Sequence, residues 1–197
     1  MTTTKRKFGK KNKIKVNPLE YNIGLIGESG IGKTSTLIQV DEKLVGEDGY
    51  MLLSLGKEDA VDAIAGAVYE EVPDWDTFIE ITDDIIENKQ TDYKELKVLI
   101  YDTIDQLFTI CEPHVIALHN RSVEPSKRVN TINGAMGGYG KGGDKVIELI
   151  LERIWDLKKV GVNMICVGHT KRKTLSDVST GEEYEMLTTN MTEKYFN

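Results

Sequence analysis

The chain has 197 residues, 40% of them hydrophobic and 29% charged, which suits one globular domain with a buried core. No apolar run approaches the roughly 18 residues that a membrane-spanning helix needs, so we expect no contact with a membrane interior. The first 17 residues carry seven cations and no acid, while the whole chain has a net charge of −7, so the remainder carries −14.

The basic N-terminal segment favours contact with nucleic acid or another polyanion, or else serves as a solvated tail. It is polar and contains no apolar signal region, which predicts a cytoplasmic protein. We therefore expect a flexible basic arm over residues 1–18 and one folded domain over residues 19–197.

The most specific motif lies between a predicted strand over residues 21–27 and a predicted helix over residues 33–46. Residues 27–34 read Gly-Glu-Ser-Gly-Ile-Gly-Lys-Thr and fit the phosphate-binding loop G-x-x-x-x-G-K-[ST] at every fixed position. A strand, a glycine-rich loop and a helix in this order form the context that the motif requires. A chance glycine-rich turn is the weaker reading, and the sequence predicts binding of a nucleoside triphosphate.

The residue types in the loop follow from phosphate chemistry. Gly27, Gly30 and Gly32 allow φ values that other residues resist, and the backbone N–H groups then form a nest for phosphate oxygens. Lys33 is expected to reach the β- and γ-phosphates and to assist catalysis, and the Thr34 hydroxyl to ligate Mg²⁺. The residues predicted to bind the nucleotide are Gly27, Glu28, Ser29, Gly30, Ile31, Gly32, Lys33, Thr34 and Ser35.

Further strands and helices alternate along the chain. Strands are predicted over 50–55, 97–102 and 162–168, and helices over 58–70, 74–88, 104–119 and 144–160. A glycine-rich irregular segment is predicted over 121–143, a polar hairpin over 171–187 and the start of a helix at Thr188. This alternation predicts an α/β fold with a mostly parallel sheet, helices on both faces and the ligand at the carboxyl ends of the strands.

An aspartate ends the predicted strand over 97–102, where Leu-Ile-Tyr precedes Asp102. A buried strand would hold this carboxylate beside the phosphate loop, where it could bind Mg²⁺ directly or through water. Asp102 and Thr34 are therefore the predicted metal ligands, although a helix-capping role for Asp102 is the alternative. Asp105 lies one turn further on and is expected at the surface or behind the metal ligands.

Three further groups are candidates at the same edge of the sheet. Glu58 follows the second strand and is a candidate catalytic base, with Asp59 as its rival and a purely helix-stabilising role for both as the alternative. His169, followed by Thr170, is a candidate sensor of the γ-phosphate. The cations Lys171, Arg172 and Lys173 could serve a neighbouring subunit's phosphates, touch nucleic acid or be solvated.

Four segments together resemble phage-encoded RecA-core ATPases, some of which are similar to single-strand-annealing recombinases. These segments are the phosphate loop, Ile-Tyr-Asp-Thr-Ile-Asp over 100–105, Gly-Gly-Tyr-Gly-Lys over 137–141 and Val-Gly-His-Thr-Lys over 167–171. The resemblance covers about residues 20–190. A RecA core continues with another central strand, which we do not find before Asn197, so we expect a domain shortened at its C-terminal end.

The resemblance implies a RecA-like three-layer core that binds ATP and Mg²⁺, binds single-stranded DNA and assembles as a ring or filament. Lys33 and Thr34 would bind phosphate and Mg²⁺, Asp102 would assist the metal, and His169 would sense the nucleotide. The glycine-rich loop near 134–143 would lie where RecA-like proteins place DNA-contacting segments. The implied function is an ATPase acting on single-stranded DNA in phage recombination or replication.

Two other functions stay open. A small-molecule or nucleotide kinase usually clamps phosphates with clustered arginines, but outside the basic arm the chain has only Arg121, Arg128, Arg153 and Arg172, without a cluster. A nucleotide-gated DNA-binding protein that does not hydrolyse ATP would need the same phosphate loop. A GTPase is disfavoured, because no Asn-Lys-x-Asp signature is present.

Overall fold

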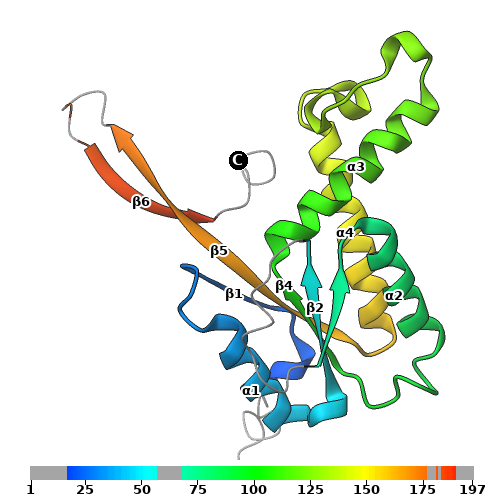
Figure 1. Ribbon diagram of the computed structural model, residues 1–197, viewed down its shortest axis with the longest axis vertical. Coiled ribbons are helices and arrows are strands. Elements are labelled where there is room, and N and C mark those ends of the chain that lie inside the picture. Colours follow the sequence, from blue (N-terminus) through cyan, green and yellow to red (C-terminus); the bar gives the residue numbers. More distant parts are fainter. Residues whose placement is uncertain (1–16, 57–67, 177–180, 182, 190–197) are drawn as a thin grey trace, which may run out of the picture.

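Figure 1 shows the computed structural model, which describes residues 17–56, 68–176, 181 and 183–189. Among these residues six strands form the sheet: β1 (Ile23–Gly27), β2 (Tyr50–Leu55), β3 (Tyr69–Val72), β4 (Val98–Asp102), β5 (Asn163–Ser176) and β6 (Glu183–Thr189). The α-helices are α1 (Lys33–Val45), α2 (Trp75–Glu87), α3 (Ile104–Ser122) and α4 (Lys141–Lys159). Short 3₁₀-helices lie at Pro18–Glu20, Glu47–Gly49, Pro125–Lys127 and Ile132–Gly137.

The strands run in the spatial order β1-β5-β4-β2-β3, and every neighbouring pair in this row is parallel. β6 lies off this row and pairs antiparallel with the outer part of β5. Because parallel neighbours need a crossover, helices connect most of the strands. The expected α/β fold with a mostly parallel sheet is confirmed.

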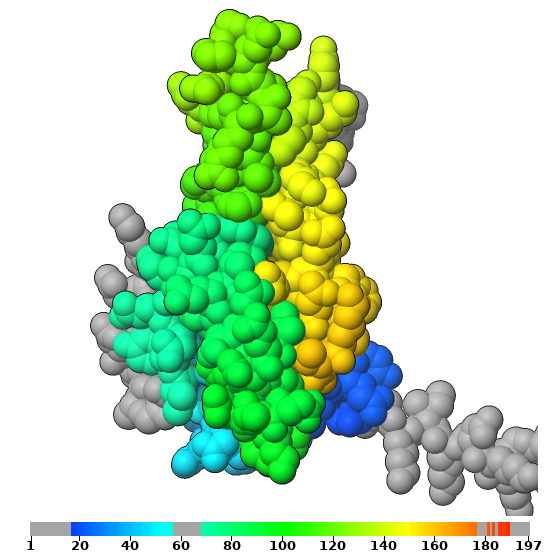
Figure 2. All heavy atoms as spheres, turned by 90° about the vertical axis from the view of Figure 1, so that its right-hand side faces the viewer, coloured from blue at the N-terminus to red at the C-terminus, as the bar shows by residue number. Residues whose placement is uncertain are grey.

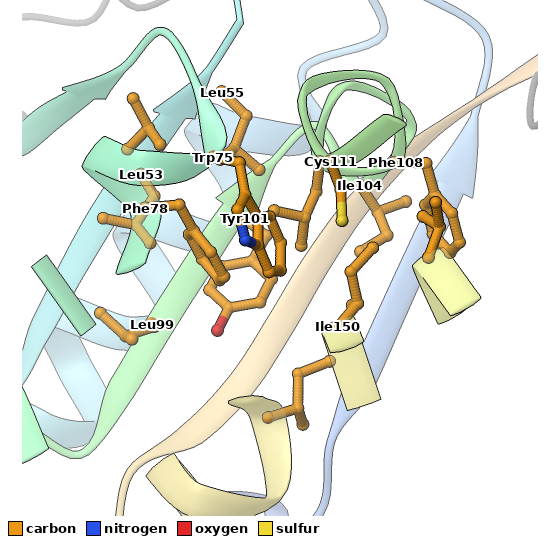
Figure 3. Packing of buried hydrophobic residues seen from close by; sticks show 14 of the residues in the cluster. Leu53, Leu55, Trp75, Phe78, Leu99, Tyr101, Ile104, Phe108, Cys111 and Ile150 are labelled. Carbon is orange, nitrogen blue, oxygen red and sulfur yellow. The ribbon is translucent and has the colours of Figure 1, made fainter. Parts of the chain in front are cut away.

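Helices cover both faces of the sheet, because side chains alternate along each buried strand. Leu53 and Leu55 of β2 point to the face covered by α2, α3 and α4, whereas Leu52 points to the face covered by α1. Figure 3 shows the larger cluster, in which the ring of Tyr101 from β4 packs edge-on against Phe78 of α2. In the resulting three layers, Asp102 at the carboxyl end of β4 reaches Thr34, which follows the loop after β1.

The predicted strand over 162–168 and the first arm of the predicted hairpin form one continuous strand, β5. Its inner part pairs with β1 and β4 on either side, and its outer part pairs with β6, with Thr170 opposite Thr189. The hairpin is confirmed, although most of its turn lies outside the described residues. Thr188 belongs to β6, so the helix expected to start there is wrong at this residue.

Two other expectations need correction. The helix predicted over 58–70 is wrong at its end, because residues 69 and 70 belong to β3, and residues 57–67 lie outside the described part. The segment predicted to be irregular over 121–143 contains two 3₁₀-helices and the first turn of α4. Glycines suggested a loop there, but Gly142 lies in α4, and it must be glycine because a Cβ atom would collide with the backbone carbonyl oxygen of Ile132.

The connection between α3 and α4 extends the molecule beyond the carboxyl ends of the strands. Figure 2 shows the ends of these two helices as a projection that rises above α2. The backbone N–H of Met136 donates to Nδ1 of His119, which fixes the glycine-rich connection to α3. Within the described ranges, none of the helices combines the length and apolarity needed to cross a bilayer.

Candidate functional site

The phosphate loop connects the end of β1 to the start of α1, as the sequence predicts. Gly30 and Gly32 have φ angles of 77° and 85°, in the left-handed region that favours glycine. Gly27 differs, because it is an extended residue of β1, where an added Cβ would crowd the side chain of Ile31. Gly30 and Gly32 are therefore required by the backbone conformation, and Gly27 is required by the close approach of Ile31.

Lys33 is buried and bonded to its own loop. Its Nζ donates to the backbone carbonyl oxygen of Gly27 at 3.1 Å and to that of Glu28 at 2.7 Å. A buried ammonium needs such partners because the loss of its hydration is costly. The ammonium is thus held inside the loop, at the place where the motif requires a cation for the β- and γ-phosphates.

The two predicted metal ligands lie in direct contact. The hydroxyl of Thr34, at the start of α1, donates a 2.6 Å hydrogen bond to Oδ2 of Asp102, at the end of β4. Asp102 is buried, and its strand is buried along its whole length. The parallel sheet therefore brings together two residues from separate motifs, as the sequence predicts.

This pair suits a magnesium ion that arrives with a nucleotide. Hydroxyl and carboxylate oxygens are hard donors, and Mg²⁺ commonly uses one or two protein oxygens together with phosphates and water. Among the described residues there is no cluster of three or more histidine, cysteine, aspartate or glutamate side chains that could hold a metal alone. The donor set fits an ion that is shared with phosphate oxygens.

His169 lies at the same edge of the sheet, in register with Gly27 of β1. Its backbone N–H donates to Oδ2 of Asp105 at 3.1 Å, and its Nδ1 lies 3.8 Å from the same oxygen. The expected neighbourhood of His169 and the phosphate loop is confirmed. Its role as a sensor of the γ-phosphate stays a prediction.

Two positions were expected for Asp105, and its burial excludes the one at the surface. Its side chain is 11% exposed, and burial raises the pKa of its carboxyl, an effect opposed by the hydrogen bond from His169 and by the charges of His169 and Lys33. Its second oxygen, Oδ1, is buried without a hydrogen-bond partner in the described structure. Through its hydrogen bond with His169, Asp105 connects the first turn of α3 to β5. In the sequence, its spacing of three residues from Asp102 indicated that it lies near the predicted metal site.

Arg172 connects the hairpin to the phosphate loop. One guanidinium nitrogen lies 3.3 Å from Oε1 of Glu28, and the other lies 3.3 Å from Oε2 of Glu185 on β6. These two carboxylates raise the pKa of Arg172 further above its usual range. The sequence placed Arg172 near this edge but did not indicate its partner in the loop.

The other candidates are not brought to the loop by any described contact. Glu58 and Asp59 lie outside the described residues. Arg153 pairs with Asp83 of α2, away from the loop, so the described arginines form no phosphate-clamping cluster.

Tyr139 stands out on the projection. It is fully exposed and has a φ angle of 52°, between Gly138 and Gly140, which also have positive φ angles. A left-handed conformation is unfavourable for an aromatic residue, and such strain is frequent at functional sites. An aromatic residue between glycines was the sequence signal for this feature.

Comparison with known proteins agrees with this geometry. Among curated proteins, no relative matches the chain. Residues 19–197 match the family described as AAA domain, which covers the phosphate loop, Asp102 and the β5–β6 hairpin. With its parallel sheet, phosphate loop and strand-end aspartate, the chain belongs to this family of nucleotide-binding P-loop NTPase domains.

Proposed function

We propose that this chain is a Mg²⁺-dependent ATPase that acts on single-stranded DNA in phage recombination or replication. The observation that carries the ATPase part is the contact between Thr34 and Asp102 next to the buried ammonium of Lys33. A cation for the phosphates and two oxygens for Mg²⁺ are the parts that P-loop ATPases share.

Each residue has a distinct task in this proposal. Lys33 exchanges its two carbonyl partners for the β- and γ-phosphate oxygens, and Thr34 and Asp102 hold Mg²⁺. When bound there, Mg²⁺ would supply charge neutralisation for the phosphate oxygens as the γ-phosphoryl group passes to water. Asp105 keeps the end of β5, and with it His169, beside the loop.

Single-stranded DNA as the partner is supported by the surface of the projection. Residues 121–141 contain four cations, Arg121, Lys127, Arg128 and Lys141, and a single acid, Glu124, in a chain with a net charge of −7. Exposed Tyr139 adds a flat aromatic ring to this basic surface. Cations that follow the backbone and aromatic rings that stack on bases are the usual features of single-strand binding.

The proposal includes self-assembly as a ring or filament, which brings several DNA-contacting projections onto one strand. Sizing of the protein with ATP, with ADP and with single-stranded DNA tests this part. A particle that remains a monomer under all three conditions contradicts it.

The central experiment is steady-state ATP hydrolysis with Mg²⁺, with and without single-stranded DNA, in the wild type and in Lys33→Ala. We expect turnover that DNA stimulates and that the variant lacks. Conversion of ATP to ADP that ignores DNA and occurs only when a small phosphate acceptor is added indicates a kinase instead. Tight ATP binding without turnover indicates a nucleotide-gated DNA-binding protein.

A further inference from the structure

Two cations converge on Glu28, the first loop residue after β1. The backbone carbonyl oxygen of Glu28 accepts from Lys33, and its side chain accepts from Arg172. Because the lysine of this motif serves the β- and γ-phosphates, the space beside Glu28 is where the terminal phosphates of a bound nucleotide lie. Arg172 therefore already lies at the mouth of the loop from its own chain.

The position of Arg172 is set by the course of β5. This strand passes His169, in register with Gly27 at the end of β1, and continues into the hairpin without a break. Arg172 is the third residue after His169, and Glu185 of β6 holds its other nitrogen. The guanidinium is thus placed from two strands, and it reaches the loop without a neighbouring subunit.

The present partners of Arg172 are weak ones. Each carboxylate receives a single nitrogen at 3.3 Å, which is longer than a strong charged hydrogen bond, and the arginine side chain is 66% exposed. Exposed ion pairs contribute little because water screens them. A phosphate carries more charge and matches the planar fork of an arginine with two parallel hydrogen bonds.

We propose that Arg172 is a specificity-determining residue that leaves Glu28 and binds the terminal phosphate of a nucleoside triphosphate in cis. A nucleoside diphosphate has no γ-phosphate to compete with Glu28 for the guanidinium, so Arg172 keeps its ion pair with Glu28 when a diphosphate is bound. When Arg172 changes partner from Glu28 to the phosphate, the β5–β6 hairpin loses its ion pair with the loop and is held by the nucleotide instead. This assignment rests on the proposed nucleotide site and replaces the expected action of this cation on a neighbouring subunit.

The test compares affinities for ADP and for a non-hydrolysable ATP analogue, both with Mg²⁺, in protein diluted until it is monomeric. Arg172→Ala is expected to weaken binding of the analogue by about 10-fold to 100-fold, as the loss of a charged hydrogen bond does, and of ADP by less than about 2-fold. Glu28→Gln is expected to act in the opposite direction, with about 2-fold to 5-fold tighter binding of the analogue, because it removes the competing charge.

Two further variants separate this role from a general effect of charge. Glu28→Gln in the Arg172→Ala background should no longer tighten binding of the analogue, because its effect acts through Arg172. Lys43→Ala removes one cation at the exposed far end of α1 and should leave both affinities unchanged. Thermal unfolding checks that the exposed substitutions leave the fold intact.

The outcomes distinguish this proposal from the proposed function. Equal weakening of both nucleotides by Arg172→Ala, or no weakening of either, overturns the assignment while nucleotide binding by the wild type stands. Weakening that appears only at concentrations where the protein self-associates also overturns it, because the arginine then acts between subunits. A wild type that binds neither nucleotide overturns both proposals.

Discussion

The hydroxyl of Thr34 and the carboxylate of Asp102 lie 2.6 Å apart although 68 positions separate them in the sequence. The parallel sheet produces this contact, because β1 and β4 both run toward the same edge, on either side of β5. In the proposed function these two oxygens would hold a magnesium ion together with phosphate oxygens.

Asp102→Asn should remove most of the benefit that Mg²⁺ gives to ATP binding. The amide has nearly the shape of the carboxylate but lacks its charge, and a hard cation prefers charged oxygens. We expect the ratio of ATP affinities with and without Mg²⁺ to fall at least about 10-fold, as measured by titration calorimetry. Asp76→Asn, at a carboxylate that is 94% exposed on α2, should keep the wild-type ratio. An unchanged ratio in Asp102→Asn would contradict the metal assignment.

Asp41 provides a prediction about stability. It lies in α1, fully buried without a hydrogen-bond partner in the described structure, and burial raises the pKa of its carboxyl from 3.8 to about 6. The folded protein therefore holds this proton more tightly than the unfolded chain. The resulting destabilisation is absent below about pH 4, grows between pH 4 and 6, and reaches about 3 kcal/mol above pH 6.

Asp41→Asn should remove this pH-dependent loss. Compared with the wild type, we expect the variant to gain up to about 3 kcal/mol in its free energy of unfolding at pH 8 relative to pH 3.5. Urea unfolding at both pH values measures the difference. Asp92→Asn, at an exposed position after α2, is the matched control and should show little change. A parallel pH dependence of Asp41→Asn and the wild type would mean that the carboxyl ionises without cost.

Tyr139 should contribute to binding of single-stranded DNA by stacking on a base. Removal of one stacking ring typically costs about 1–3 kcal/mol, so Tyr139→Ala should weaken DNA binding by about 5-fold to 150-fold. Fluorescence anisotropy with a labelled oligonucleotide measures the effect. Tyr139→Phe keeps the ring and should bind like the wild type, and ATP affinity without DNA should be the same in all three proteins. Equal DNA affinity of the alanine and wild-type proteins would exclude stacking.

The basic arm should contribute through charge alone. Deletion of residues 1–17 removes seven cations, and each phosphate contact that is lost should reduce the slope of log K against log salt by about 0.7. We expect weaker DNA binding with a clearly shallower slope in a salt titration. A second protein, in which the same seven positions are glutamine, separates charge from chain length. An unchanged slope in both proteins would show that the arm is only a solvated tail.

Local patterns were sufficient to predict the part of the site that depends on short motifs. The phosphate loop, its flanking strand and helix, and the aspartate at the end of β4 follow from residue type and spacing. His169 was also expected at the same edge of the sheet as the loop, and the pairing of β5 with β1 places it there. These features involve buried strands whose apolar runs are easy to recognise.

The rest depends on tertiary contacts that no local pattern encodes. The edge strand β3 reads Tyr-Glu-Glu-Val, too short and too acidic to indicate a strand, and its pairing with β2 decides its conformation. The glycines that open α4 suggested a loop, but Gly142 is required by the close approach of Ile132. The burial of Asp105 and the contact between Arg172 and Glu28 arise only when α3, β1 and the hairpin meet.

The continuous strand β5 runs from the central sheet into the β5–β6 hairpin, and we expect these two parts of the strand to differ in local stability. Between Asn163 and His169 it pairs with β1 or β4, and with both over residues 165–167, whereas from Thr170 to Ser176 its one described strand neighbour is β6. Hairpins with one partner open locally far more readily than central strands, so amide hydrogen exchange should change sharply near His169. The edge that carries the phosphate loop thus lies next to this expected change in local stability, where the free energy of ligand binding could order or release the outer strand.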